Sequence, residues 1–372
     1  MSEHVKLSEV CEILNSNVDK KTKENEQKVK LCNFTDVYNN WAITKYTSKK
    51  FMKATATQNE INKFSLKKGY VAITKDSETK DDIGISTYIA DNFDNVLLGY
   101  HCTLLKPNQK VLNGKFLNAY LSSFYGKKYF SNCASGSGQR YTLTIDTIKD
   151  LNIPLINIET QQKIARTLSV LDKKIENNNK INELLHTLAY KIYEYYFKYK
   201  PKNAKLEQII IENPKSNIMV KNAQKTQDKY PFFTSGDNIL SYPKSIIDGR
   251  NCFLNTGGNA GIKFYVGKAS YSTDTWCICA NEFSDYLYLL LSSIKNHINQ
   301  SFFQGTSLKH LQKNLLKKYP IYMPSTHEIK KFNQIIMPLL TLISINTRTS
   351  KKLEQIRDFL LPLLLKQQVK PK

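Results

Sequence analysis

Hydrophobic residues recur at alternating steps of four and three along two long stretches of the chain, 157–200 and 325–372. Such steps keep a narrow apolar stripe on one side of a helix, which is the seam of a coiled coil. The seam positions are Ile164, Leu168, Leu171, Ile175, Asn178, Asn182, Leu185, Ala189, Ile192 and Tyr196, then Phe332, Ile336, Leu339, Ile343, Asn346, Ser350, Leu353, Arg357, Leu360 and Leu364. Because a lone helix cannot bury its seam, we expect these two helices to pair with each other.

The middle of each seam is polar. Asn178 and Asn182 in the first stretch correspond in order to Asn346 and Ser350 in the second. Polar residues at seam positions fix the register of coiled-coil helices, and we prefer this role to a ligand site.

The ends of the two stretches also match. Asn157 and Ser325 are placed to cap the first turn, and Ser325 and Glu328 have the spacing of a capping box. Pro201 prevents the first helix from continuing past Lys200. A proline in a helix interior costs about 3 kcal/mol, so Pro338 predicts a bend in the second helix.

Each long helix follows a globular block of shorter elements. In the first block the apolar pattern predicts a helical opening at 6–14, strands at 29–34, 70–74 and 96–105, a helix at 116–129 and a loop at 135–141. In the second block the opening returns at 205–209, with strands at 230–233, 252–254 and 262–266, a helix at 286–297 and a loop at 305–309. We therefore expect an α+β fold with a pseudo-twofold internal repeat. Two globular α/β domains, 1–156 and 201–324, are separated by long helices, 157–200 and 325–372, that form an antiparallel coiled coil.

The charge of the chain is strongly basic. There are 54 Lys and Arg residues against 32 Asp and Glu, a formal net charge of +22. This excess predicts a polyanionic partner, nucleic acid before membrane. The chain is also rich in Asn, Ile, Tyr and Phe, a composition typical of AT-rich genomes, so codon bias is an alternative source of part of the lysine excess.

Cysteine usage and apolar runs predict the compartment. The 7 Cys residues have no disulfide-framework spacing, which indicates free thiols in a reducing compartment. The opening residues lack the regions of a signal peptide, and the longest apolar run, 359–365, is too short to span a bilayer. We expect a soluble, cytoplasmic protein that does not bind a membrane.

No motif in the sequence indicates a reaction centre. The absence of Pro-Pro excludes the Asn-Pro-Pro-aromatic motif of adenine methyltransferases, and the absence of Pro-Asp argues against a PD-type nuclease site. There is neither a P-loop nor a zincin motif. Cys277 and Cys279 lack the second ligand pair that zinc requires, so two small buried strand residues are the favoured interpretation. We expect no catalytic residue, no metal site and no bound cofactor.

Three loops, 135–141, 256–261 and 305–309, are candidates for touching DNA. In 135–141, Gln139 can read adenine, and Arg140 can read guanine or hold a phosphate, although an ordinary polar loop is an equal alternative. For 256–261, a hairpin turn is favoured over a phosphate-binding loop. The tyrosines of 190–199 are expected to pack against the globular blocks rather than stack on bases. The candidate DNA contacts are Lys75, Gly138, Gln139, Arg140, Tyr141, Thr256, Asn259, Thr306, Ser307 and Lys309.

With this layout the chain resembles the specificity subunits of Type I restriction-modification systems. The resemblance covers essentially the whole chain and is strongest in the two helical repeats. In the first half it rests on Ile153-Pro154-Leu155, Gln161-Gln162-Lys163-Ile164-Ala165 and Leu171-Asp172-Lys173-Lys174-Ile175-Glu176. In the second half it rests on Tyr319-Pro320-Ile321, Phe332-Asn333, Pro338-Leu339, Ile343 and Leu353-Glu354-Gln355-Ile356-Arg357-Asp358. The first proline segment departs from the family, with Ile156 and Asn157 where a second proline is common.

The resemblance implies a non-catalytic protein that chooses a DNA sequence. Each block would be a target recognition domain reading one half of a bipartite site in double-stranded DNA, and the paired helices would fix the distance between the halves. In the family the helices dock modification subunits, of which we expect two, and a restriction subunit adds nuclease and translocase activities. S-adenosylmethionine would bind the modification partner and not this chain.

Two other functions remain as alternatives. One is a self-sufficient DNA-modifying enzyme with an unrecognised site, which the missing methyltransferase motif argues against. The other is a coiled-coil adaptor whose blocks bind DNA, RNA or protein. A whole-chain repeat with matching helix register favours the specificity subunit over both.

Overall fold

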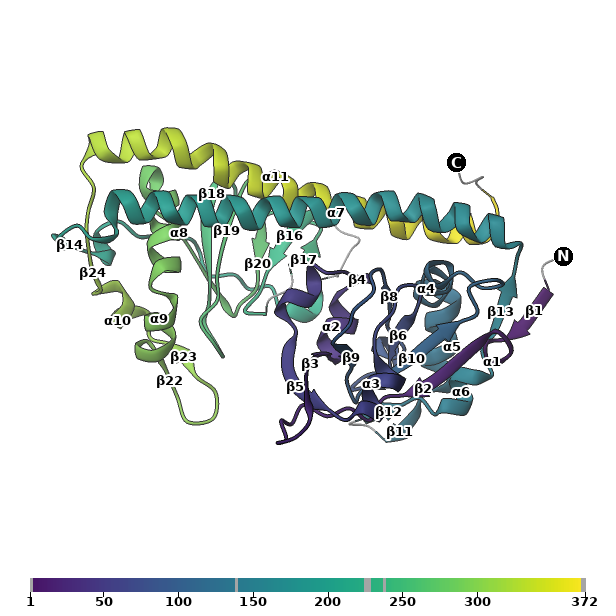
Figure 1. Cartoon of the computed structure of the whole chain (residues 1–372). Helices are drawn as coiled ribbons and strands as arrows, with labels where there is room; N and C mark the ends of the chain where they lie inside the picture. The colour runs from purple at the N-terminus through teal and green to yellow at the C-terminus, as the bar shows by residue number, and fades with distance from the viewer. Residues whose placement is uncertain (1–2, 138–139, 224–228, 237–238, 369–372) are drawn as a thin grey trace. The chain divides into compact units, whose positions relative to one another are not determined.

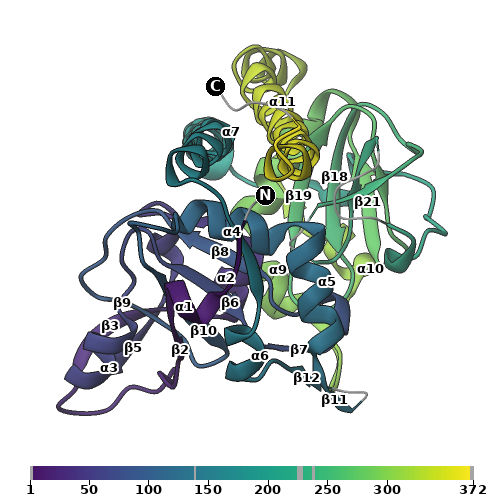
Figure 2. The same cartoon turned by 90° about the vertical axis from the view of Figure 1, so that its right-hand side faces the viewer.

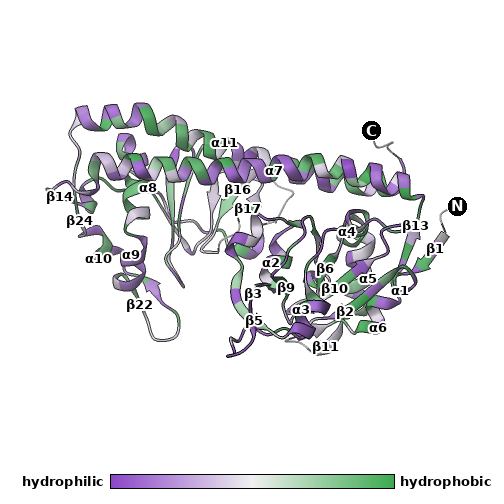
Figure 3. Ribbon diagram, in the orientation of Figure 1, coloured by the Kyte–Doolittle hydropathy of each residue, from purple (hydrophilic) through white to green (hydrophobic). Residues whose placement is uncertain are grey.

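Both long helices are present in the computed structural model, which describes residues 3–137, 140–223, 229–236 and 239–368. Helix α7 spans Ile158–Tyr193 and continues as one π-helical turn over Glu194–Lys198, just short of the predicted end at Lys200. Helix α11 spans Thr326–Leu365 and passes through Pro338 without interruption. The bend at Pro338 stays a prediction. Hydrophobic and hydrophilic positions alternate along both helices (Figure 3).

The predicted caps begin both helices. The side-chain oxygen of Asn157 accepts a hydrogen bond from the Glu159 amide at 2.7 Å. At the start of α11 the Ser325 amide donates to the Glu328 carboxylate at 2.9 Å, and the Glu328 amide donates to the Ser325 hydroxyl at 3.3 Å. This reciprocal pair is the capping box, which satisfies two amides that have no partner within the helix.

The chain divides into two compact units. Unit 1 comprises 1–173 with 356–372, and unit 2 comprises 174–355. Each unit therefore contains one globular block and a section of both long helices. The predicted boundaries at 156, 200 and 324, which give the helices domains of their own, stay a prediction.

In unit 1 a five-stranded sheet lies between helices. Its order is β2 (Cys11–Asn15), β10 (Cys102–Pro107), β6 (Val71–Thr74), β8 (Ser86–Ile89), β4 (Ala42–Ile43), antiparallel except for the β4–β8 pair. The central strand β6 is buried at every position, as expected when both faces of a sheet are covered. Helix α4 (Gly114–Ser122) lies between this sheet and the first part of α7, and α2 (Phe34–Asn39) also packs on β6 and β8 (Figures 1 and 2).

Smaller sheets and helices complete unit 1. Three-stranded sheets join β5 (Met52–Ala56), β3 (Gln27–Cys32) and β9 (Val96–Leu98), and β11 (Ser135–Ser137), β12 (Arg140–Thr142) and β7 (Asp76–Ser77). A two-stranded ribbon pairs β1 (Glu3–Lys6) with β13 (Asn152–Leu155). The remaining helices are α1 (Leu7–Val10), η1 (Thr47–Lys50), α3 (Gln58–Phe64), η2 (Lys80–Asp82), α5 (Phe124–Cys133) and α6 (Ile145–Lys149).

Unit 2 is built on a four-stranded antiparallel sheet. Its order is β15 (Ile211–Glu212), β21 (Thr275–Cys279), β18 (Arg250–Asn255), β19 (Ile262–Val266), and α8 (Ser284–Ser293) packs on β18 and β19. The other strands are β14 (Ala204–Lys205), β16 (Tyr230–Phe233), β17 (Leu240–Tyr242), β20 (Ser270–Tyr271), β22 (Phe303–Gln304), β23 (His310–Leu311) and β24 (Pro320–Ile321). The remaining helices are η4 (Leu206–Gln208), η5 (Val220–Asn222), η6 (Asn281–Phe283), α9 (Lys295–Ser301) and α10 (Lys313–Lys317).

The predicted internal repeat is visible in the order of the elements. In each unit a short opening strand pairs with the strand before the long helix, β1 with β13 and β14 with β24. Between these strands both units have two consecutive helices, a β-hairpin and a short helix, which are α4, α5, β11–β12 and α6 in unit 1 and α8, α9, β22–β23 and α10 in unit 2. The fold is thus α+β with two globular blocks and two long antiparallel helices.

Several predicted elements are shorter than expected. The opening helix ends at Val10 because 11–15 pairs with β10 as a strand, a tertiary contact that overrides local pattern. The predicted helix 116–129 is two helices, since Ser123 has an extended backbone and its hydroxyl donates to the Tyr120 carbonyl at 2.6 Å. The predicted strand 96–105 is split by a turn at 99–101, and the described part of 135–141 is hairpin strand rather than loop. None of the described helices is long and apolar enough to cross a membrane.

Candidate DNA interface and its helical support

Polar side chains join the middle parts of α7 and α11 within unit 2. The Asn178 amide donates to the Ser350 hydroxyl at 3.2 Å, and Asn346 donates to the Asn182 side-chain oxygen at 2.9 Å. Asn182 also donates to the Thr347 hydroxyl at 3.5 Å. Residue numbers rise along one helix as they fall along the other, so the helices are antiparallel. A shift of one helix along the other by one turn would break all three hydrogen bonds. These polar seam residues therefore favour a single register of the two helices.

All twenty predicted seam positions are turned away from solvent to some degree. The buried ones are Ile164, Leu168, Ala189, Phe332, Ile336, Ile343, Ser350 and Leu364. The half-buried ones are Leu171, Ile175, Asn178, Asn182, Leu185, Ile192, Tyr196, Leu339, Asn346, Leu353, Arg357 and Leu360.

Buried polar contacts fasten the block of unit 1 to α7. Gln161 is fully buried; its side-chain oxygen accepts from the Asn113 amide at 2.9 Å, and its nitrogen donates to the Val111 carbonyl at 2.9 Å. The Lys115 ammonium lies 3.1 Å from the Asp172 carboxylate. Asp172 is also 3.7 Å from Arg357 of α11. The side of the unit 1 block that faces the long helices is therefore bound to α7 through Gln161 and Asp172, and Asp172 also links α7 to α11.

Arg250 has the corresponding role in unit 2. From β18 it forms a two-pronged ion pair with Asp285 of α8, whose side chain is 2% exposed. The same guanidinium donates to the Thr341 hydroxyl at 3.0 Å and to the Met337 carbonyl at 3.3 Å on α11. Burial raises the pKa of Asp285 although Arg250 opposes the shift. The block and its helix thus share one buried charge pair.

The aromatic residues after Ala189 pack in the core of unit 2. Phe197 lies edge-on to Tyr286 and Phe332, with ring centroids 5.2 and 4.9 Å apart. Tyr193 is 2% exposed, and burial raises its pKa to about 12. These rings therefore pack as predicted, whereas Tyr195 and Tyr199 remain 86% and 84% exposed.

Strand pairing in unit 1 gathers basic and aromatic side chains on one surface. Strand β12 pairs with β7, and the Leu143 amide donates to the Lys75 carbonyl at 2.8 Å. This register places Thr142 opposite Asp76, and Arg140 reaches the Asp76 carboxylate, next in the chain to the predicted contact Lys75. The predicted contact Tyr141 lies opposite Ser77, and the Lys80 ammonium lies over its ring at 5.5 Å. Gly138 and Gln139, also predicted, lie outside the described residues. The hairpin lies on the side of unit 1 opposite α7 (Figures 1 and 2).

Three further residues complete this surface, and we name Lys75, Asp76, Tyr100, His101 and Arg140 the Arg140 cluster. The Asp76 Oδ2 atom accepts from Arg140 Nη2 at 3.2 Å and lies 2.8 Å from His101 Nδ1, which is itself 3.2 Å from Arg140 Nη2. The Lys75 ammonium lies over the Tyr100 ring at 4.7 Å. Arg140 is 59% exposed, Asp76 only 14%. The cluster therefore presents cations and an aromatic ring around one recessed carboxylate.

The predicted contacts of unit 2 also come together. The 256–261 segment is the turn between β18 and β19, in line with the favoured interpretation, and it lies against the β22–β23 hairpin: the Gly258 amide donates to the Lys309 carbonyl at 2.9 Å. Thr306, Ser307 and Lys309 are exposed at the hairpin tip, and Asn259 is exposed on the turn. Thr256 is half-buried because its hydroxyl donates to the Asp274 carbonyl at 2.7 Å, so it supports the turn.

One glycine shapes each hairpin in the same way. Gly136 and Gly305 have φ of 146° and 143°. A Cβ at Gly136 would lie 2.1 Å from the Arg140 carbonyl oxygen, and one at Gly305 would lie 2.4 Å from the Leu308 carbonyl oxygen. Only glycine fits such a conformation and approach. Two hairpins of unlike sequence therefore each require glycine at one position.

The family model for the Type I restriction modification DNA specificity domain matches residues 2–187 and 202–355, and so includes both hairpins. The chain belongs to this family. A specificity subunit of the HindI enzyme of Haemophilus influenzae is 30% identical over 40% of this chain, and the match covers 32% of that relative. The MjaIX specificity subunit of Methanocaldococcus jannaschii is 25% identical over 80% of this chain and 74% of that relative.

A solved structure has the same fold. The S subunit of a Type-I restriction-modification system from M. genitalium aligns with 98% of this chain and 96% of its own length, with a TM-score of 0.54 and 17% identity. At this identity the likeness concerns the fold alone.

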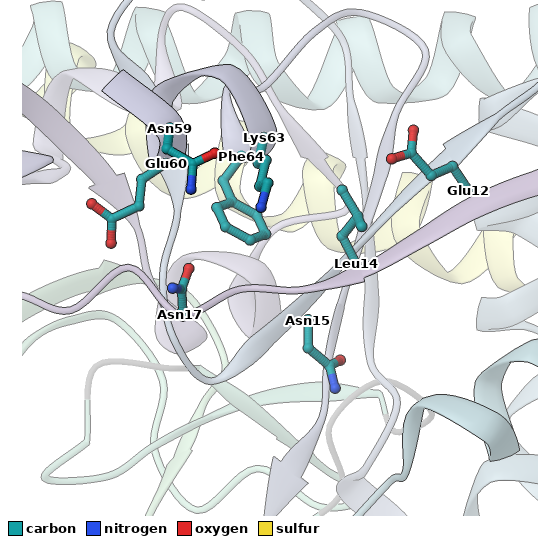
Figure 4. A pocket seen from close by; sticks show the side chains of 8 residues that line it. All are labelled: Glu12, Leu14, Asn15, Asn17, Asn59, Glu60, Lys63 and Phe64. Atoms are coloured by element: carbon teal, nitrogen blue, oxygen red, sulfur yellow. The ribbon is translucent and has the colours of Figure 1, made fainter. Parts of the chain in front are cut away.

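A cavity of about 400 Å³ lies elsewhere in unit 1, between β2 and α3. Figure 4 shows Glu12 on one side of it and Glu60 and Lys63 on the other. Two carboxylates make the hollow unsuitable for a DNA phosphate. In the described ranges, no group of His, Cys, Asp or Glu side chains is arranged to hold a metal ion.

Sequence reasoning missed Asp76, Tyr100 and His101. They belong to a strand of two residues and to a turn, so neither helical nor strand periodicity marks them. The one available signal was Tyr100-His101 next to glycine at the end of an apolar run, which is also a common turn.

Proposed function

We propose that this chain is the DNA sequence-specificity subunit of a Type I restriction-modification complex, and that each unit reads one half of a bipartite site in double-stranded DNA. The observation that carries the proposal is the repeated hairpin: each unit presents one glycine-shaped hairpin with basic or hydroxyl side chains, on the side opposite its long helices (Figure 1). Exposed lysines would hold phosphates, and side chains near the hairpins would read base edges.

The paired helices would serve as the spacer. Helix α7 has 36 residues, which at 1.5 Å per residue is about 54 Å of helix. Half-sites read from one face of DNA recur about every 34 Å, one helical turn. A rod whose register is fixed by Asn178 and Asn182 would keep the distance between half-sites constant.

The same helices would dock the modification subunits. Ile181, Leu184 and Leu188 lie at steps of three and four on α7 and are 44%, 71% and 49% exposed. An apolar stripe with this exposure supports a protein partner. Because the chain is an internal repeat, we expect two modification subunits, with a restriction subunit in the complete enzyme. Replacing Leu184 and Leu188 by Glu should abolish co-purification with the modification subunit, whereas Tyr195→Glu should preserve it.

Adenine methylation would be carried out by the partner. This chain would hold no cofactor, and S-adenosylmethionine would bind the modification subunit. Its place of action would be the cytoplasm, where prokaryotic DNA lies.

The decisive experiment is single-molecule sequencing of genomic DNA for methylated adenine, with and without this gene. Loss of methylation at one bipartite motif would establish the function and supply the target. Retention of every methylated motif, in a strain whose modification subunit is active, would refute it. Methyl transfer by the purified chain alone would instead indicate a self-sufficient enzyme, and failure of duplex DNA to compete for its partner would indicate an adaptor.

A further inference from the structure

Within the Arg140 cluster, Asp76 is positioned by structure on both of its sides. Residues 76–77 form β7, which pairs with β12, and the Lys75 amide donates to the His101 carbonyl at 3.1 Å. The backbone that carries Asp76 is therefore tied to both neighbouring segments. Its carboxylate, 14% exposed, is a fixed acceptor beneath an exposed arginine.

The Asp76 carboxylate restricts how Arg140 can sit. Oδ2 accepts a hydrogen bond from Arg140 Nη2 at 3.2 Å and lies 2.8 Å from His101 Nδ1. In the described part of the chain the contacts of the guanidinium all involve Nη2. A guanidinium has five N–H donors, and Nη2 carries two of them, so one Nη2 hydrogen can bond to Asp76 while the other forms a fork with the neighbouring Nη1 donor for a ligand. An arginine held in advance also loses less side-chain entropy when it binds.

The same carboxylate selects the kind of ligand. A phosphate oxygen beside Arg140 would approach a second negative charge at Asp76, which is unfavourable. Guanine presents the neutral acceptors O6 and N7 in the major groove, and an arginine fork matches them in pairs. Lys75, held over Tyr100 at 4.7 Å, remains to contact the backbone.

We propose that Asp76 is a positioning residue that directs Arg140 onto a guanine, so that the pair determines one base of the first half-site. This inference rests on the proposed function. Arg140 touches the base, and Asp76 acts through Arg140.

The test uses the full-length chain assembled with its modification subunits, and selection from duplexes randomised in both half-sites. Arg140→Ala should lower the preference for guanine at one position about tenfold or more. Asp76→Ala should lower the preference at that same position, and the double variant should resemble Arg140→Ala alone because Asp76 has no base contact of its own. Asp76→Asn, which keeps the shape and removes the charge, guards against misfolding of the hairpin and should lower the same preference.

Asp146→Asn is the matched control, since it removes the same charge from the same unit at a side chain that is 81% exposed. It should leave every base preference unchanged. If Asp76 variants that melt like the wild type keep the guanine preference, alter a different position, or add their effect fully to that of Arg140→Ala, the inference is wrong while the proposed function stands. If the wild-type complex selects no bipartite sequence, the proposed function itself fails.

Discussion

Arg250 shows what one side chain contributes to holding a globular block on its helix. It pairs with the buried Asp285, bonds to α11 through Thr341 and lies 5.7 Å from the centre of the Phe264 ring. Removing one partner of a buried ion pair leaves an uncompensated charge, which costs about 3–5 kcal/mol.

We therefore expect Arg250→Ala to lower the free energy of unfolding of unit 2 by several kcal/mol, of the order of the cost for any broken buried pair. Urea denaturation followed by circular dichroism measures this. Arg348→Ala is the control: Arg348 is exposed and lies over the Tyr265 ring at 5.7 Å, so its loss should cost about 1 kcal/mol or less. Equal losses in the two variants would contradict the role of the buried pair.

His186 predicts a dependence of stability on pH. Its Nδ1 atom lies 3.2 Å from the Tyr288 hydroxyl, and burial lowers its pKa below the ordinary value of 6.5. The unfolded chain therefore takes up a proton more readily than the folded one, so this group destabilises the fold as pH falls below 6.5 and has no effect well above it.

We expect the melting temperature of the chain to fall between about pH 7.5 and about pH 5, and His186→Phe to reduce that fall. The exposed His327 offers a control, since His327→Ala should leave the difference between the two pH values unchanged. If the melting temperature falls by the same amount in the wild type and in His186→Phe, His186 is not the source of the pH dependence.

At the scale of elements, the hairpins depend on their glycines. Gly305→Ala would combine a φ of 143° with a Cβ only 2.4 Å from the Leu308 carbonyl oxygen. Strain of this kind costs on the order of 1–3 kcal/mol, and here it would displace the tip that carries Ser307 and Lys309.

Gly305→Ala should therefore weaken recognition of the second half-site and leave the first unchanged, as measured by selection from duplexes randomised one half at a time. Gly249→Ala is a sharp control, because Gly249 has a φ of 95° but open space around its Cβ position. It should lose stability without altering sequence choice. A changed base preference at the first half-site in Gly305→Ala would contradict the proposal that each unit reads one half-site.

The elements also show where sequence is informative. Long helices with a seam repeat the same step many times, so Ile164 and Phe332 could be identified from spacing alone, and Asn157 and Ser325 from capping chemistry. The Arg140 cluster could not be identified from the sequence. It depends on strands of two or three residues whose pairing joins Asp76 to Arg140 across the block, and such non-local contacts leave no period in the chain. The prediction of a single helix over 116–129 was also wrong. The helix ends at Ser123, whose hydroxyl donates to the Tyr120 carbonyl, and the apolar pattern does not mark this break.

At the scale of the whole molecule, the two surfaces that we propose to contact DNA belong to different compact units. Substitutions at sites without shared partners usually add within about 0.5 kcal/mol. We expect the losses of DNA-binding free energy in Arg140→Ala and Lys309→Ala to add in the double variant, as measured by fluorescence titration with the complete bipartite duplex.

The same titration at several salt concentrations provides a second check. With a net charge of +22, binding should weaken steeply with salt, and a substitution that removes one lysine from a DNA phosphate should lower the slope by about one. In the additivity test, a loss in the Arg140→Ala and Lys309→Ala double variant that departs strongly from the sum of the two single losses would mean that the units do not read DNA independently.

The two terminal ribbons have a consequence for inheritance. Each block begins and ends in one antiparallel ribbon, with Val5 opposite Ile153 in the first and Lys205 opposite Pro320 in the second. A genetic crossover at both edges of such a ribbon replaces a whole block and leaves the helix that follows it intact. If each block reads a half-site as proposed, such an exchange would change the DNA target and leave the surfaces of the long helices unchanged.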